Sequence, residues 1–208
     1  MKHSRGRITS LSDGVFAFAA TLMVVDLGTT IDFNHLDNQI SSFISFGIAF
    51  FVMMLLWKLH YNFFQRTKYV DNWIIATNII LLFTVLFYLF PLKSLINSIT
   101  KKTQLGEDGL SHLFLLYGFG FALIFSCYAF LYYRAYKKDK NNKNTSLLLF
   151  YHKHFVIFIF TAVLSIVLAF FKVGITFGLP GFAYSTLGIT CYINVLRFKK
   201  KHPDAFKN

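Results

Sequence analysis

The chain of 208 residues is 55% hydrophobic and only 14% charged, with 27 phenylalanines, whereas soluble domains average roughly 45–50% apolar and about 25% charged residues. A water-soluble fold of this length could not cover so much apolar surface, so the composition excludes soluble classes and indicates contact with lipid. The net charge of +12 does not predict nucleic-acid binding, because the positive residues collect in short stretches between apolar runs, a pattern typical of membrane topology.

Six apolar stretches are close to the roughly 20 residues that a helix needs to span a bilayer. We therefore predict an all-α membrane protein, with a single domain of six transmembrane helices over residues 1–208. The expected spans are residues 11–30, 42–63, 73–95, 110–133, 147–171 and 173–196. The segment Gly178–Gly181, which contains Pro180, offers a place where the sixth span could be interrupted.

The charges between these stretches predict an orientation. Basic residues precede the first span and dominate the second and fourth loops, whereas the charged residues of the first loop are Asp32 and Asp37. Cytoplasmic loops carry an excess of Lys and Arg. The alternation therefore predicts a multi-pass protein of the cell membrane with both termini in the cytoplasm.

This orientation brings polar residues from three helices to one membrane depth. Arg7 and Asp13 lie near the cytoplasmic end of the first span, Trp57 and His60 near that of the second, and Asn78 about one turn inside the third. A carboxylate within a span needs compensation, which Arg7 or a protonated His60 could supply as charge. Trp57 and Asn78 could add hydrogen bonds. The cluster is interpreted as a polar staple between three helices or as a gating or proton-sensing site.

Helical geometry separates two faces of the first span. At 100° per residue, Phe18, Leu22 and Val25 form one apolar stripe, flanked by Thr21. The stripe could face lipid, lie in a core, or line a pore where identical helices meet, and periodicity alone does not choose. In a pore, bulky apolar side chains would exclude hydrated ions by dewetting, and Thr21 would offer a hydroxyl to a passing cation.

A second stripe of the same helix carries Asp13. It also contains the residues Ala17, Ala20 and Val24. Small side chains allow helices to approach closely, so we expect this second stripe, Asp13 included, to pack against the rest of the subunit.

The segment Arg7-x-x-x-Leu11-Ser12-Asp13 resembles the opening signature, Arg-x-x-x-Phe-Ser-Asp, of the prokaryotic branch of the transmembrane protein 175 family of potassium-permeable channels. Further fragments of this resemblance follow in the same order: residues 22–27, Trp57-x-x-His60, Asn78, and Phe90-Pro91. Together they cover the first three expected spans.

The resemblance implies a six-helix subunit that assembles as a homotetramer around its first helix and conducts potassium ions across the lipid bilayer. By position, the constriction would consist of Phe18, Leu22 and Val25 beside Thr21, and Phe18 stands where the family usually carries Ile or Leu. The residues that would organise the cytoplasmic half of the pore helix are Arg7, Ser12, Asp13, Trp57 and His60. The Thr-Val-Gly-Tyr-Gly filter of other potassium channels does not occur in the sequence.

The leading hypothesis is therefore a potassium-preferring cation channel gated by the apolar stripe. An alternative is a proton-coupled secondary transporter that uses Asp13 and His60 as a relay, with the possible break at Gly178–Gly181 forming a substrate site. A third is a membrane-embedded adaptor without transport. The sequence shows no paired acids, nucleophile with a base, phosphate loop or metal-ligand spacing, so we expect no enzyme activity, cofactor or metal.

Overall fold

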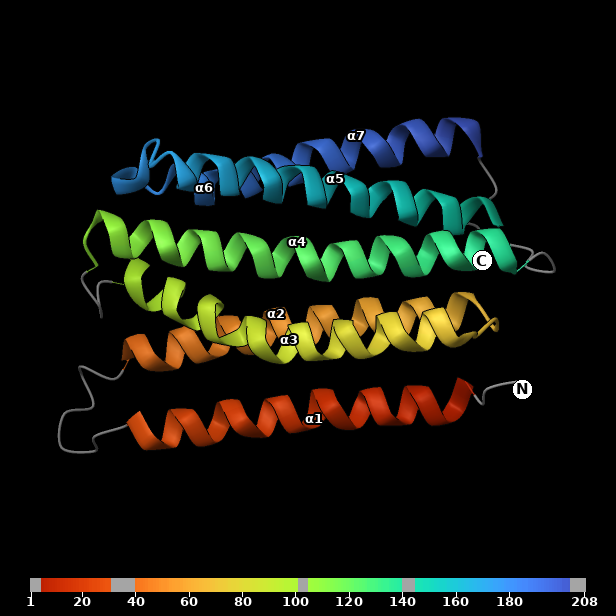
Figure 1. The fold of residues 1–208 in the computed structure, drawn as a ribbon, viewed down its shortest axis with the longest axis horizontal. Coiled ribbons are helices and arrows are strands. Elements are labelled where there is room, and N and C mark those ends of the chain that lie inside the picture. The colour runs from red at the N-terminus through yellow and green to blue at the C-terminus, as the bar shows by residue number, and fades with distance from the viewer. Residues whose placement is uncertain (1–4, 31–39, 101–104, 140–144, 203–208) are drawn as a thin grey trace.

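The computed structural model describes residues 5–30, 40–100, 105–139 and 145–202. All regular elements in these ranges are helical, which confirms the all-α prediction. The long helices are α1 (Arg5–Thr30), α2 (Ile40–Arg66), α3 (Asn72–Ile99), α4 (Glu107–Lys138) and α5 (Thr145–Phe170). They run up and down with nearly parallel axes (Figure 1). Asp32 and Asp37, the acids of the first expected loop, lie outside the described residues.

Within the described ranges, these five helices are long and apolar enough to cross a membrane. Each coincides with one of the first five expected spans and begins before it. The first shows the largest difference, since α1 starts at Arg5 rather than at residue 11. Polar residues at the ends continue the helices beyond the apolar stretches, where headgroups and water can solvate their side chains.

The sixth expected span differs from the structure at its start. After α5 the backbone turns, and Gly174 and Gly178 adopt left-handed conformations with φ of 61° and 70°. A Cβ on Gly174 would lie 2.8 Å from the Leu179 Cβ, so this turn requires glycine. The helix begins only with α6 (Leu179–Phe182) and continues through a 3-10 turn, Ala183–Ser185, into α7 (Thr186–Lys201). The interruption therefore lies directly before Pro180, a position where proline suits a helix start.

Aromatic side chains form the interface between α4 and α5. The ring centroids of Phe125 and Phe158 are 4.4 Å apart, and those of Tyr128 and Phe155 are 5.4 Å apart. The Tyr128 hydroxyl also donates to the Leu56 carbonyl of α2 at 2.7 Å. This buried aromatic layer is the centre of the subunit, since α2 and α3 pack on its other side.

Helix α3 has a defined start and a bend. The Asp71 carboxylate caps its N-terminus by accepting the Ile74 backbone N–H at 2.9 Å. Pro91 lies inside the helix and removes one backbone donor. The last turns of α3 bend toward the start of α4 (Figure 1).

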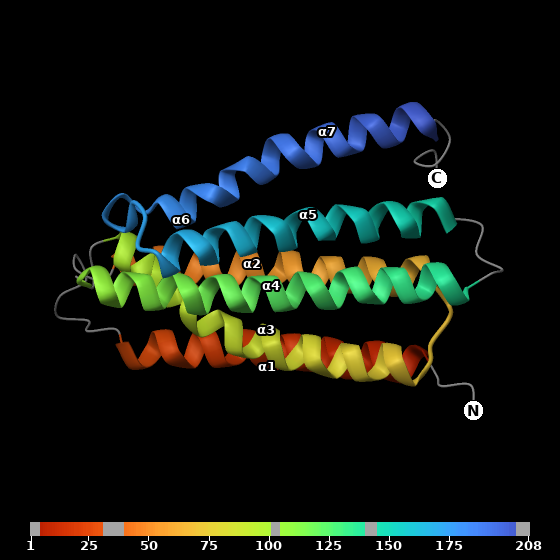
Figure 2. The same ribbon diagram turned by 45° about the horizontal axis from the view of Figure 1, so that its top comes forward.

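Helix α1 lies at one edge of the bundle, where it packs on α2 and α3 (Figure 1). Only 17% of its most apolar stretch is buried, against 50% in α3 and in α4. At the opposite edge, α7 diverges from α5 toward its C-terminal end (Figure 2). The subunit therefore exposes most of its first helix, although that helix is apolar enough to cross a membrane.

Candidate functional site

One face of α1 packs against the bundle. Its buried residues are Ser12, Phe16, Ala19, Met23 and Leu27. They recur at intervals of three and four residues, so they share one side of the helix. Their centre lies about 150° around the helix from the line through Phe18 and Val25.

The opposite face carries the candidate constriction. Phe18, Leu22 and Val25 are 58%, 47% and 57% exposed, which is high for large apolar side chains. Thr21 is exposed beside them and donates its hydroxyl to the Ala17 carbonyl at 3.1 Å, which leaves the oxygen lone pairs free to accept or coordinate. The subunit itself therefore leaves this stripe uncovered.

The expectation for the second stripe of α1 is wrong. Ala17 and Val24 are exposed, and Asp13 is exposed as well, whereas only Ala20 is partly buried. The packed face is rotated toward Phe16 and Ala19, whose side chains meet α2 and α3. Asp13 lies at the edge of that face, from which its carboxylate can still reach a neighbouring helix.

A chain of hydrogen bonds joins α1, α2 and α3 through buried side chains. The Asn78 amide donates to the Ser12 hydroxyl at 3.0 Å, and Ser12 donates to the Ile8 carbonyl at 2.9 Å. His60 Nε2 lies 2.7 Å from Asn78 Oδ1. That amide oxygen is an acceptor, so His60 carries its proton on Nε2 and donates to Asn78. The hydrogen bonds therefore all point the same way, from His60 through Asn78 and Ser12 to the Ile8 carbonyl. All three side chains are buried, so each bond also avoids an unsatisfied polar group.

A second contact ties α1 to α2 at the same depth. The Trp57 indole N–H donates to Asp13 Oδ1 at 2.8 Å. Trp57 and His60 thus point from one face of α2 toward α1 and α3, as their spacing of three predicts. Of the expected cluster, Ser12, Asp13, Trp57, His60 and Asn78 come together in two adjacent hydrogen-bonded groups.

Arg7 does not join this cluster. Its side chain is exposed and has no polar partner among the described residues, whereas Arg5 donates to Gln65 of α2 at 3.4 Å. Asp13 and His60 also bond to different partners, Trp57 and Asn78, rather than to each other. The direct relay between Asp13 and His60 that a proton-coupled transporter would use is therefore not formed.

A group of contacts that was not predicted from the sequence lies at the end of the bundle that contains the polar cluster. Arg66 at the end of α2 donates to the Tyr132 hydroxyl at 3.1 Å and to the Tyr151 hydroxyl at 3.0 Å. Asp71, which caps α3, accepts from Arg134 of α4 at 2.7 Å. Burial raises the pKa of Asp71, but the hydrogen bonds from the Ile74 backbone, Arg134 and Tyr69 outweigh it and lower that pKa below its usual value.

An ion pair at the other end of α1 was also missed. Lys93 of α3 pairs with Asp26, next to a pocket of about 350 Å³ between α1, α2 and α3. Leu22 and Phe90 line this pocket. The signal in the sequence was the placement of Asp26 and Lys93 directly after apolar stretches, where charges at similar depth on neighbouring helices can pair.

Comparison with known proteins identifies the part of the chain that holds this site. The sequence model of the family described as endosomal/lysosomal potassium channel TMEM175 matches residues 7–88. This range runs from the first turn of α1 into α3 and includes every residue of the candidate constriction and of the expected polar cluster.

Two curated bacterial relatives carry the name potassium channel. One from Marivirga tractuosa is 34% identical over 146 residues, which are 63% of this chain and 59% of that protein. One from Streptomyces collinus is 29% identical over 114 residues, which are 52% of each. The chain thus spans about half the length of the curated relatives it matches.

Two solved structures are similar over nearly the whole chain. A crystal structure of a variant of the potassium channel MtTMEM175, in complex with a nanobody–MBP fusion protein, matches with a TM-score of 0.76 and 26% identity over 94% of this chain and 93% of that one. A structure described as a lysosomal potassium-selective channel TMEM175 homolog from Chamaesiphon minutus matches in fold, with a TM-score of 0.60 and 22% identity over 88% and 97% of the two chains. On these similarities, the chain is a multi-pass membrane protein that is similar to TMEM175 channels, in sequence over residues 7–88 and in fold over nearly its whole length.

Proposed function

We propose that the protein is a potassium-preferring cation channel whose subunits assemble as a homotetramer around α1. The observation that carries this proposal is the exposure of Phe18, Leu22 and Val25 on a helix whose opposite face is packed. A face this apolar needs lipid or protein to cover it, and a symmetric assembly around α1 would bring four copies of it together around an axis. The names of the bacterial relatives and of the similar structures support potassium as the permeating ion.

In this proposal the stripe is the gate. Rings of Phe18, Leu22 and Val25 would narrow the pore and offer no oxygen to replace the hydration shell of a potassium ion, so a narrow arrangement excludes ions by dewetting. The Thr21 hydroxyl would be the polar group closest to the narrow segment. Opening would then require a small rotation or tilt of α1 that widens the ring.

The two hydrogen-bonded groups would act as a brace for this gate. Ser12, Asn78 and His60 hold α1 on α2 and α3 from its buried side, and Trp57 holds Asp13 at the edge. These bonds fix the rotation of α1, and they therefore fix which residues face away from the subunit. A change in the brace would alter the gate although no brace residue lies on the apolar stripe.

The topology in this proposal has six spans, with both termini in the cytoplasm of a cell-membrane protein. The helical segment from Leu179 to Lys201 would be the sixth span, since its 23 residues give a length of about 34 Å, enough for a hydrocarbon core of about 30 Å. The whole chain then forms a single channel domain. The basic residues in the last turns of α4 and α7 would lie at the cytoplasmic surface, in agreement with the positive-inside rule.

Potassium flux into liposomes tests the proposal. Reconstituted protein should conduct potassium, and Phe18→Ala and Leu22→Ala should raise the initial rate by about tenfold, which corresponds to a barrier lowered by about 1.4 kcal/mol. Phe160→Ala is a matched control, because Phe160 is also an exposed phenylalanine, on α5 and away from the stripe. Flux that is unchanged in both α1 variants would exclude the gate, and absence of flux together with a monomeric mass in detergent would exclude the channel.

A further inference from the structure

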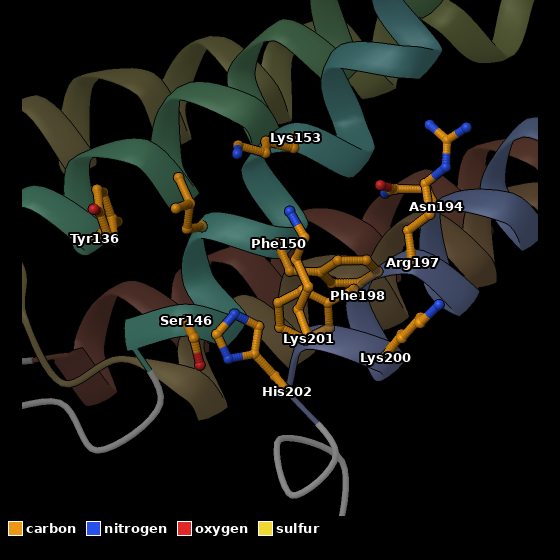
Figure 3. Close-up of a pocket in the computed structure, with 11 residues that line it drawn as sticks. Tyr136, Ser146, Phe150, Lys153, Asn194, Arg197, Phe198, Lys200, Lys201 and His202 are labelled. Carbon is orange, nitrogen blue, oxygen red and sulfur yellow. The ribbon is translucent and has the colours of Figure 1, made fainter.

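A pocket rich in basic residues lies between α5 and α7, at the far edge of the subunit from α1. It has a volume of about 650 Å³ and is lined by the first turns of α5, the end of α7 and Tyr136 of α4. Figure 3 shows the rings of Phe150 and Phe198 near the centre of this pocket, with basic side chains around them. The divergence of α7 from α5 opens the space (Figure 2).

The charged residues of the lining are all cationic. Lys153, Arg197, Lys200 and Lys201 contribute four formal positive charges, and none of the residues that line the pocket is Asp or Glu. None of these four takes part in a salt bridge found among the described residues. A group of cations without a nearby acid repels itself and favours an anionic ligand.

The apolar part of the lining is a stack of rings. The centroids of Phe150 and Phe198 are 4.5 Å apart, and the His202 ring lies 4.9 Å from that of Phe198. The remaining apolar residue of the lining is Leu149 of α5. A ligand that fills the pocket therefore meets both cations and an apolar wall.

The depth of Lys153 favours a ligand from the membrane. Lys153 follows the start of α5 by eight residues, or about 12 Å along the helix axis. A helix of 26 residues is about 39 Å long, so it exceeds the hydrocarbon core by only a few ångströms at each end. An ammonium group at this depth needs an anion nearby or must extend toward the headgroups.

We propose that this pocket binds the phosphate headgroup of an anionic phospholipid, with an acyl chain against the rings of Phe150 and Phe198. Lys153 and Arg197 would approach the phosphate from the two helices, and Lys200 and Lys201 would add charge at the surface. The neutral Asn194 amide, held 3.3 Å from the His154 ring, supplies a further donor beside them. The bound lipid would bridge α5 and α7 where the protein itself leaves them apart.

Lipid binding is measured by native mass spectrometry of the purified full chain, titrated with phosphatidylglycerol or phosphatidylcholine. Wild-type protein should prefer phosphatidylglycerol by at least about tenfold, and Lys153→Gln/Arg197→Gln/Lys200→Gln should lose most of that preference, since each basic residue near an anionic headgroup contributes about fivefold. The matched control is Lys68→Gln/Lys137→Gln/Lys138→Gln, which removes the same charge from exposed lysines at the same end of the bundle, outside the pocket.

Competition with inorganic phosphate distinguishes the two sources of the anion. Phosphatidylglycerol should stay bound in millimolar phosphate, because the acyl chain adds affinity. Binding of phosphate as tight as that of the lipid, an unchanged preference in the pocket variant, or an equal loss in the control would each overturn the proposal. Lys200→Glu, a reversal at an exposed side chain, supplies the same test if the triple variant does not fold.

Discussion

The indole of Trp57 holds the carboxylate of Asp13 from a neighbouring helix, with 2.8 Å between Nε1 and Oδ1. Asp13 lies at the boundary between the packed face of α1 and its exposed face. The bond therefore attaches α1 to α2 at the edge of the packed face. Its loss would leave the Ser12–Asn78 bond as the remaining side-chain hydrogen bond of the brace on α1. The bond therefore has a consequence for stability and, in the proposed channel, for the gate.

A double-mutant cycle measures this contact. Asp13→Ala and Trp57→Phe should each lower the unfolding free energy in detergent, and their effects should be coupled by about 1 kcal/mol, the contribution of a charge-assisted hydrogen bond at a partly exposed site. Asp26→Ala with Trp57→Phe is the control pair, because Asp26 bonds to Lys93 at the other end of α1. Additive effects for Asp13 and Trp57 would show that the bond contributes nothing.

The hydrogen bonds of Asn78 should contribute more to the unfolding free energy than the bond between Trp57 and Asp13. Asn78→Leu removes the hydrogen-bond partner of the buried His60 and the donor to the buried Ser12 hydroxyl, so we expect the unfolding free energy to fall by about 2–4 kcal/mol. Thr84→Val on the same helix is the control, because among the described residues the buried Thr84 hydroxyl bonds to the Ile80 carbonyl alone, at 2.7 Å. The Thr84→Val variant should lose less than about 1 kcal/mol of unfolding free energy in the same titration. Equal losses for the two variants would contradict the role given to Asn78.

The polar cluster could be predicted from the sequence because topology fixes depth. Ser12, Asp13, Trp57, His60 and Asn78 all lie at one level once the spans are placed, and polar side chains at one level within a membrane bundle find each other. The exclusion of Arg7 could not be foreseen. Its position in the first turn leaves it solvated, and a basic residue that water can reach gains little from a buried partner.

The packed face of α1 could not be predicted from hydrophobic periodicity. Phe16 and Phe18 are equally apolar, yet the first is buried and the second exposed. In lipid the outside of a helix is as apolar as the inside, so the pattern that separates the two faces of a soluble helix is missing. The segment Gly178–Gly181 marked a possible break of the sixth span, but the left-handed backbone at Gly174 could not be placed, because an average of hydropathy does not register it.

Acid should weaken the contacts around Asp71. The lowered pKa of this carboxyl means that its contribution to stability is fully present above the usual carboxyl pKa of about 4 and is lost as the pH falls through the lower, folded-state value. Melting temperatures in detergent between pH 3 and pH 7 should therefore fall at the acidic end for wild-type protein.

Asp71→Asn should be less stable at neutral pH and should show a smaller fall in acid, because it has no carboxylate to protonate. Glu107→Gln is the control, since Glu107 is exposed at the start of α4 and should leave the acid response as in wild-type protein. If the melting temperature of Asp71→Asn fell in acid as much as that of wild-type protein, the acid response would come from another titrating group.

Two glycines on different helices should respond in opposite ways to a methyl group. A Cβ on Gly120 of α4 would lie 2.8 Å from Cδ2 of the buried Tyr88 ring, whereas a Cβ on Gly14 of α1 would have no heavy atom within 4 Å. Gly120→Ala should therefore lower the unfolding free energy by about 1–3 kcal/mol through overpacking. Gly14→Ala should raise it by up to about 1 kcal/mol, because alanine favours the helix. Destabilisation by Gly14→Ala in detergent-solubilised monomers would show that α1 packs more closely within the subunit than the structure indicates; destabilisation confined to the oligomer would instead place Gly14 where copies of α1 meet.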